Sequence, residues 1–294
     1  MYYTKIGDVL VAQGNLSEGM KSYRDGLAIA DRLAKTDPGN ADWQHDLSAY
    51  YTKIGDVLVA QGNLPEALKS YRDGLAIVEH LAEADPSNAG LQREVALSLS
   101  HIGDVKVRTG DANGAAGNYE QALANVRRLT ERDAHNTFWL RDMTVTVNKL
   151  GDARSQTGDT GAAAASYDES LAIARRLAAR DPSNPLWQSD LWFALNKLGE
   201  AKLSLGDIAA ARGFYADGLP IIRRLASRDP GDVQQQINLV INLYRLARVQ
   251  DGSERKHALK EALAILEKLQ AAKQLTPDKI GWAELIRGML ASGP

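Results

Sequence analysis

The sequence of 294 residues contains no cysteine, and this absence removes several kinds of chemistry at once. Without thiols the chain has no disulfide framework, no thiolate zinc site and no cysteine nucleophile. Lysine and arginine number 35 against 37 aspartates and glutamates, so the charge balance gives no reason to expect a nucleic acid or a membrane surface as partner. No apolar run approaches the roughly 18 residues of a membrane span, and no secretory signal is recognisable. We therefore expect a cytoplasmic protein.

The usual motifs of catalysis and metal binding are also missing. The five histidines show no HxxxH or HExxH spacing, and the glycine-rich stretch Gly110–Glu120 lacks the lysine of a phosphate-binding loop. Acid–base catalysis needs one unequal pair of carboxylates, whereas the carboxylates of this chain form a regular column. That column consists of Asp8, Asp56, Asp104, Asp152 and Glu200. We therefore predict a chain that is not an enzyme and holds no metal and no cofactor.

What the sequence has in abundance is repetition. The letters YTKIGDVLVAQGNL occur at Tyr3–Leu16 and again, unchanged, at Tyr51–Leu64. Glycines recur every 48 residues through five copies in two series, which are Gly7, Gly55, Gly103, Gly151 and Gly199, then Gly14, Gly62, Gly110, Gly158 and Gly206. A sixth copy is degenerate, with Ala247 in place of the first glycine. Self-similarity at a fixed period of this length is the signature of a solenoid.

Each copy carries the signals of two helices, which we call helix A and helix B. Apolar residues recur at three-to-four spacing from Leu91 to Val107, which is the stripe of an amphipathic helix A. A glycine of the second series ends that helix, and helix B of the second copy runs from about Leu64 to Ala84, where Asp-Pro closes it. We expect each first-series glycine to let the two helices approach, with the tyrosine of helix B beside it.

This layout resembles the tetratricopeptide repeat (TPR) family. The family pattern W-x2-L-G-x2-Y…A-x3-F…P maps, in the second copy, onto Tyr51, Ile54, Gly55, Leu58, Ala67 and Tyr71. The family period is 34, so each copy here is fourteen residues longer, seven for each helix, as in the lengthened repeats of kinesin light chains and bacterial signalling proteins. The resemblance implies an all-α, right-handed superhelical solenoid of antiparallel helix pairs.

We expect a single solenoid domain over residues 1–294. Its repeats are predicted at about 1–38, 39–86, 87–134, 135–182, 183–230 and 231–272, with one capping helix at 276–291. The motif that follows Met1 corresponds to the middle of a longer segment, Ala49–Asp56, in the second copy. For that reason we expect the chain to be a fragment of a longer protein.

The resemblance also implies where a partner binds. In TPR arrays helix A lines the concave inner wall, and the ligand-contacting positions surround its glycine. At these positions the chain changes from small residues near its N-terminus to larger and more polar ones near its C-terminus, so the second half is the better candidate. The predicted groove residues are Asn148, Lys149, Asp152, Gln156, Phe193, Asn196, Lys197, Glu200, Tyr244 and Arg248. They are predicted to hold a peptide or protein segment, which makes the chain a non-enzymatic interaction scaffold.

Two features leave alternatives open. A basic column that includes Lys53 and Lys149 lies two residues before each glycine, and we interpret it as a solvated ladder in which Lys149 pairs with Asp152 on the same helix. A clamp for a peptide's terminal carboxylate is the alternative, weakened by the acids that occupy its asparagine positions. Arginines at the ends of three B helices suit the helix dipole, and leave a nucleic-acid-binding solenoid as a weaker alternative.

A different class of function is also compatible with the repeats. The chain could be the sensor or oligomerisation region of a larger multidomain signalling effector. The shortened first helix would then expose a repeat face, through which copies could associate end to end.

Overall fold

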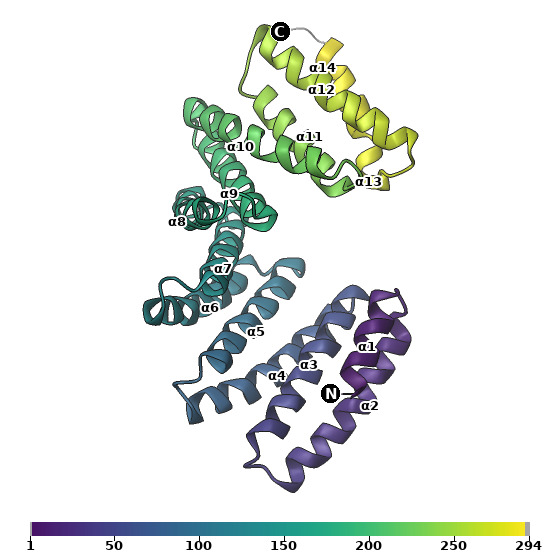
Figure 1. Ribbon diagram of the computed structural model, residues 1–294, viewed down its shortest axis with the longest axis vertical. Coiled ribbons are helices and arrows are strands. Elements are labelled where there is room, and N and C mark those ends of the chain that lie inside the picture. The colour runs from purple at the N-terminus through teal and green to yellow at the C-terminus, as the bar shows by residue number, and fades with distance from the viewer. Residues whose placement is uncertain (1, 292–294) are drawn as a thin grey trace. The chain divides into compact units, whose positions relative to one another are not determined.

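The computed structural model describes residues 2–291, which form fourteen helices and no strand in that range (Figure 1). The all-α prediction is therefore confirmed. The chain divides into two compact units, residues 1–157 and 158–294, which we call the N-terminal and C-terminal units and describe separately. The single domain over the whole chain stays a prediction.

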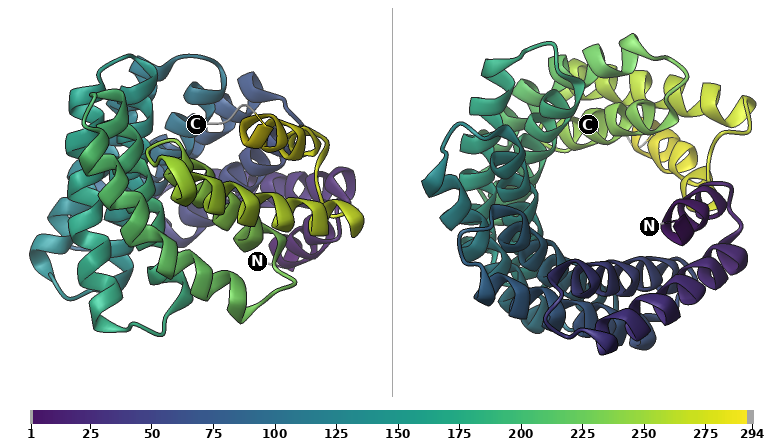
Figure 2. Two further views of the ribbon diagram at one scale, coloured as in Figure 1. Left: turned by 90° about the horizontal axis from the view of Figure 1, so that it is seen from above. Right: turned by 60° about the horizontal axis from the view of Figure 1, so that its bottom comes forward.

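The N-terminal unit consists of alternating A and B helices joined by short turns. Its A helices are α1 (Tyr2–Ala12), α3 (Ala41–Ala60), α5 (Ala89–Arg108) and α7 (Thr137–Gln156), and its B helices are α2 (Leu16–Thr36), α4 (Leu64–Ala84) and α6 (Ala112–Arg132). Each helix packs on the next one along the chain, as the two further views show (Figure 2). The observed bounds of α4 are those that the sequence predicts.

The C-terminal unit continues the same alternation and then ends differently. Its helices are α8 (Thr160–Arg180), α9 (Pro185–Ser204), α10 (Ile208–Arg228), α11 (Val233–Ala247), α12 (Gly252–Ala271), α13 (Pro277–Ile280) and α14 (Trp282–Ala291). The single capping helix predicted at 276–291 is interrupted at Gly281, which separates the one turn of α13 from α14. Helix α14 packs on α12 and covers the end of the array.

The two glycine series have two different structural reasons. Gly62 and Gly110 of the second series have φ of +78° and +85°, a left-handed conformation that ends helix A and that side chains rarely adopt. Gly55 and Gly103 of the first series face a tyrosine instead, because a Cβ at either position would lie 2.5 Å from the ring of the helix B tyrosine. The predicted close approach of helices A and B is confirmed in these copies.

No helix among residues 2–291 combines the length and the apolarity that crossing a membrane requires.

Candidate functional site

Successive A helices of the N-terminal unit are joined by ion pairs that link one copy to the next. Lys53 Nζ lies 2.8 Å from a carboxylate oxygen of Asp8, and Lys149 Nζ lies 2.6 Å from one of Asp104. We call these two pairs the Asp–Lys ladder. The sequence predicted that each lysine would pair with the aspartate three residues later on its own helix. In the structure each of these lysines instead pairs with the aspartate of the preceding copy.

A tyrosine of helix B also binds the aspartate of the acidic column in each of the first three copies. The hydroxyls of Tyr23, Tyr71 and Tyr119 each donate a hydrogen bond of 2.7 Å to Asp8, Asp56 and Asp104 respectively. The glycine next to each aspartate makes room for the ring, and the ring carries its hydroxyl to the carboxylate. Burial of these hydroxyls, together with the adjacent aspartate, raises the pKa of each tyrosine well above its ordinary value.

Raising the pH above 10 is therefore expected to destabilise the N-terminal unit. The unfolded chain loses the tyrosine protons near their ordinary pKa of 10.0, whereas the folded chain retains them. The stabilising contribution is thus complete below that pH and is lost as the pH rises through the folded-state pKa values. Urea denaturation at about pH 8 and about pH 11 checks this prediction, with Tyr119→Phe as the control. Between the two pH values the urea midpoint of the variant should fall less than that of the wild-type chain, because the variant lacks one of the hydroxyls. An equal fall in both proteins would contradict the role of the hydroxyl.

A second set of pairs joins the A helices near their N-terminal ends, and the sequence analysis missed it. His45 Nε2 lies 2.9 Å from Glu94, and the guanidinium of Arg93 makes two hydrogen bonds to the carboxylate of Asp142. The hydrogen bond to Glu94 raises the pKa of His45. In each pair a basic residue of one copy is followed 49 residues later by an acidic residue of the next copy. This spacing could have been used to predict the pairs from the sequence. Both sets of pairs stabilise the stacking of copies.

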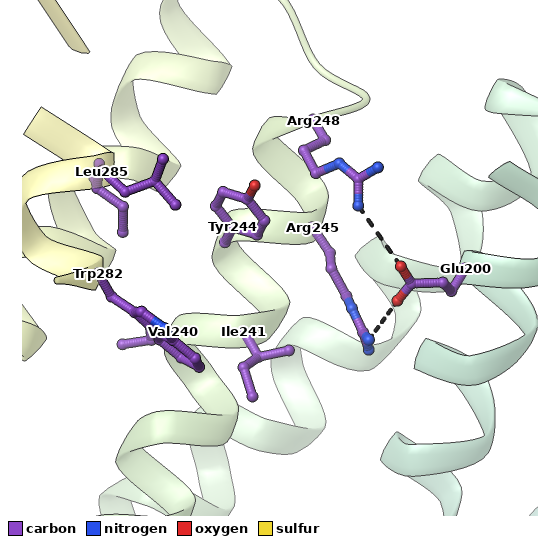
Figure 3. Close-up of a pocket in the computed structure, with 9 residues that line it drawn as sticks. Glu200, Val240, Ile241, Tyr244, Arg245, Arg248, Trp282 and Leu285 are labelled. Atoms are coloured by element: carbon purple, nitrogen blue, oxygen red, sulfur yellow. Dashed lines mark ion pairs between the residues drawn. The ribbon is translucent and has the colours of Figure 1, made fainter. Parts of the chain in front are cut away.

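The pattern changes in the C-terminal unit, where the acid of the ladder is a glutamate and its partners are arginines. Glu200 on α9 pairs with Arg245 of α11, and Arg248 Nη1 lies 3.7 Å from its other carboxylate oxygen. Two guanidinium groups thus share one carboxylate, which leaves a net positive charge. Figure 3 shows the two arginines pointing toward Glu200 from one side.

Beside these charges lies a pocket of about 400 Å³. Helix α9 supplies Glu200, and the C-terminal half of α11 supplies the floor and Arg245 (Figure 3). Arg248 directly follows α11, and α14 supplies the opposite wall. The lining residues are Glu200, Val240, Ile241, Tyr244, Arg245, Arg248, Trp282, Leu285 and Ile286. Its interior is therefore apolar and its rim charged.

Three predicted groove residues, Glu200, Tyr244 and Arg248, meet at this pocket. The three residues that α14 contributes were not predicted, because α14 lies outside the repeats and no periodic signal places it. Lys149, Asp152 and Gln156, together with Asn148, belong to α7 in the N-terminal unit. Lys149 and Asp152 are half-buried, and Gln156 is exposed.

The remaining predicted residues lie away from the pocket. Phe193 is 37% exposed, and the ammonium group of Lys197 lies 5.3 Å from the centre of its ring. Asn196 was predicted to face a ligand, but it is only 1% exposed. Its amide donates to Asn242 Oδ1 at 2.9 Å and to the Trp192 carbonyl at 3.0 Å, so it is a core residue. Asn148 is likewise buried, at 7% exposure, and neither asparagine is accessible to a ligand.

Three of the arginines at the ends of B helices have structural partners. Arg132 and Arg228 each donate to a serine carbonyl in the loop one repeat earlier, at 3.2 Å to Ser87 and Ser183. Arg223 forms a paired hydrogen bond with Glu261 on α12. These bonds account for the three arginines without a nucleic acid. Among residues 2–291, no three acidic or histidine side chains are placed to hold a metal ion.

Comparison with known proteins gives structural neighbours only. No protein-family model matches the sequence, and no curated relative matches it either. BtubC from P. vanneervenii superposes with a TM-score of 0.64 at 22% identity, over 89% of this chain and 94% of that one. The S. pombe nuclear import adaptor Nro1 gives 0.58 at 17% identity, over 96% of both chains.

A third neighbour is much longer than this chain. It is a signal transduction ATPase with numerous domains (STAND) and a tetratricopeptide repeat sensor, from Pyrococcus horikoshii. The TM-score is 0.67 at 16% identity, over 92% of this chain and 36% of that one. At these identities the likeness concerns the fold, and at that level it confirms the resemblance to TPR-like repeat proteins.

Proposed function

We propose that this chain, which has the fold of the TPR-like repeat proteins, is a non-enzymatic scaffold that binds a peptide or protein segment in the pocket between α9, α11 and α14. The observation that carries the proposal is the composition of that pocket, an apolar interior with a charged rim on one side. A volume of about 400 Å³ lies within the range of ligand sites and suits one large apolar side chain. Recognition sites combine such an anchor with a few polar groups that fix its orientation.

The neighbours add support of a general kind. Nro1 is described as an import adaptor, which is a protein that acts by binding other proteins. A protein partner is therefore the class that we propose for this chain as well. Its cytoplasmic location stays a prediction.

The pocket is tested by placing a charge on its apolar wall. Leu285 lines the pocket and is 55% exposed, so Leu285→Arg should leave folding intact while its guanidinium group opposes entry of an apolar side chain. We expect a peptide selected on the wild-type chain from a random display library to bind this variant at least tenfold more weakly by fluorescence polarisation, a change of about 1.4 kcal/mol.

Leu205→Arg is the matched control. Leu205 is 50% exposed at the end of α9 and does not line the pocket, so its substitution adds the same charge to the same unit. Binding should stay at the wild-type level in this variant. Selected peptides that bind all three proteins equally would show that the pocket is not the binding site.

A sensor within a larger effector is a second candidate, favoured by the STAND neighbour. In that protein the part that this chain matches belongs to a multidomain molecule that carries a tetratricopeptide repeat sensor. A sensor also has to bind a signal, and the same pocket would receive it. The Leu285→Arg experiment therefore tests the pocket under either candidate.

A further inference from the structure

Another pocket of the C-terminal unit, which we call the α9–α10 pocket, lies toward the opposite end of α9. Its volume is about 440 Å³, and it is formed by the turn between α8 and α9, the start of α9 and the last two turns of α10. The lining residues are Pro182, Ser183, Pro185, Gln188, Ile221, Arg224, Leu225 and Arg228. Gln188 and Glu200 are separated by about 18 Å of helix, so this pocket is distinct from the one that Glu200 lines.

The side chain of Gln188 is the unusual feature of this pocket. It is only 8% exposed, yet it forms no hydrogen bond with any residue that the structure describes. Glutamines at the same position of two other copies are bonded. The Gln92 amide donates to the Ala82 carbonyl at 3.2 Å, and the Gln236 amide donates to the Ala226 carbonyl at 2.9 Å. A buried polar group that is left unpaired is destabilising, so the unused amide of Gln188 points to a ligand.

The pocket is also positively charged. Two arginines and no acid are among the described residues that line it. Arg228 is held in place, because it donates to the Ser183 carbonyl at 3.2 Å. Arg224 is exposed and forms neither an ion pair nor a hydrogen bond within residues 2–291. The pocket therefore suits a ligand that carries a negative charge.

The same place in the third copy has a different composition. There Asn125 occupies the position of Ile221, and its side-chain oxygen accepts a hydrogen bond of 3.5 Å from Arg128. Arg128 occupies the position of Arg224. In the fifth copy isoleucine replaces this asparagine, which removes the partner of the arginine and adds apolar surface. The apolar wall, the unpaired guanidinium group and the unpaired amide thus occur together in the fifth copy.

We propose that the α9–α10 pocket binds a small organic carboxylate with an apolar body. The body lies against Pro185, Ile221 and Leu225. The carboxylate accepts hydrogen bonds from the guanidinium group of Arg224 and from the amide of Gln188. Small-molecule sites combine mostly apolar walls with a few polar groups, and about 440 Å³ lies in their usual range. This site is independent of the pocket that the proposed function uses.

The first test measures the binding of four probe carboxylates by ligand-observed NMR. The probes are hexanoate, 4-methylpentanoate, cyclohexanecarboxylate and phenylacetate, and each is compared with its primary amide, which has nearly the same shape and no charge. We expect at least one carboxylate to bind with a dissociation constant below about 5 mM, and about tenfold more tightly than its amide. Absence of binding by all four at about 10 mM, or equal binding of carboxylate and amide, would overturn the proposal.

A capped dipeptide, acetyl-Leu-Glu-amide, presents an apolar group and a carboxylate on a peptide instead. We expect it to bind more weakly than the tightest of the four probes, because its backbone has no place in a pocket of this size. If it bound more tightly than all four, the pocket would be a peptide site and the class of ligand proposed here would be wrong.

The second test asks whether the tightest probe occupies this pocket. Arg224→Gln and Gln188→Leu should each weaken its binding about tenfold, because each removes a donor to the carboxylate. Lys260→Gln is the control, since it removes one positive charge from an exposed position of α12 that does not line the pocket. The control should bind the probe as the wild-type chain does. Unchanged binding in both pocket variants, or an equal loss in all three, would show that the probe binds elsewhere.

A third measurement needs no ligand and examines the amide itself. Gln188→Leu removes an amide that is unpaired in the free chain, whereas Gln236→Leu removes one that is bonded to the Ala226 carbonyl. Leucine is the natural residue at this position in the fourth copy, as Leu140. We therefore expect the melting temperature of Gln188→Leu to equal or exceed that of the wild-type chain and that of Gln236→Leu to fall. A fall of the same size in both variants would show that the Gln188 amide already has a partner, which overturns the proposal.

Discussion

Asn242→Ala is expected to lower the free energy of unfolding of the C-terminal unit by about 3 kcal/mol. Asn242 is fully buried and is the centre of a polar network. Its Oδ1 accepts from Trp192 Nε1 and from the amide of Asn196, each at 2.9 Å, and its own amide donates to the Tyr215 carbonyl at 3.0 Å. Alanine would leave the buried Trp192 Nε1 without its acceptor and would remove one hydrogen bond each from the Asn196 amide and the Tyr215 carbonyl. Leaving a buried polar group unsatisfied costs about 1–3 kcal/mol before the surroundings relax.

Asn238→Ala on the same helix is the control. Asn238 is half-buried and its side-chain oxygen accepts a hydrogen bond from Gln234 in an exposed position, so its loss should change stability by no more than about 0.5 kcal/mol. Urea denaturation is the measurement, followed by tryptophan fluorescence because Trp192 belongs to the network. Equal midpoints for the two variants would mean that the network does not stabilise the unit.

The same network decides how the pocket can be studied. Asn196 was predicted to contact the ligand, in which case its substitution would weaken binding without lowering stability. Since its amide is bonded inside the core, Asn196→Ala is expected to destabilise the unit as well, and a loss of binding would then have two explanations. An exposed lining residue such as Leu285 avoids this ambiguity.

The sequence predicts the repeated parts of this fold well because each copy meets the same neighbours. The left-handed glycines, the close approach at Gly55 and Gly103, and the bounds of α4 all follow from local patterns that recur in each copy. Local geometry is largely determined by residues within one helical turn, and the same local pattern recurs in several copies, so each copy supports the same prediction.

Contacts between copies were harder to predict. A lysine three residues before an aspartate fits an intrahelical pair, and nothing in that spacing shows that Lys149 reaches Asp104 instead. The burial of the Asn196 side chain was equally hard to predict, because its partner Asn242 belongs to the next A helix. The position of Asn242 holds alanine in the preceding copy, so the repeat pattern does not indicate a polar partner there. The position of Trp282 depends on how α14 packs back on the array, which no repeat pattern contains.

The largest effect in the N-terminal unit is expected from Gly103→Ala, which should lower the free energy of unfolding by about 3 kcal/mol. The added Cβ would lie 2.5 Å from Tyr119 Cε1, well inside contact distance. The ring cannot withdraw without cost, because Tyr119 is 2% exposed and its hydroxyl is held by Asp104. That aspartate is in turn paired with Lys149 of the next copy, so moving the ring would disturb the connection between copies.

Gly117→Ala is the matched substitution, at another helical glycine of the same copy. Gly117 is exposed in the second turn of α6, and a Cβ built on it meets nothing within 4 Å among the residues that the structure describes. There alanine should raise the free energy of unfolding by about 0.5–1 kcal/mol, because it restricts the unfolded chain and favours the helix. Urea denaturation followed by circular dichroism should therefore move the two midpoints in opposite directions. If Gly103→Ala were as stable as the wild-type chain, the tyrosine ring would have room to move, and the first glycine series would not be required by the packing of helix A on helix B.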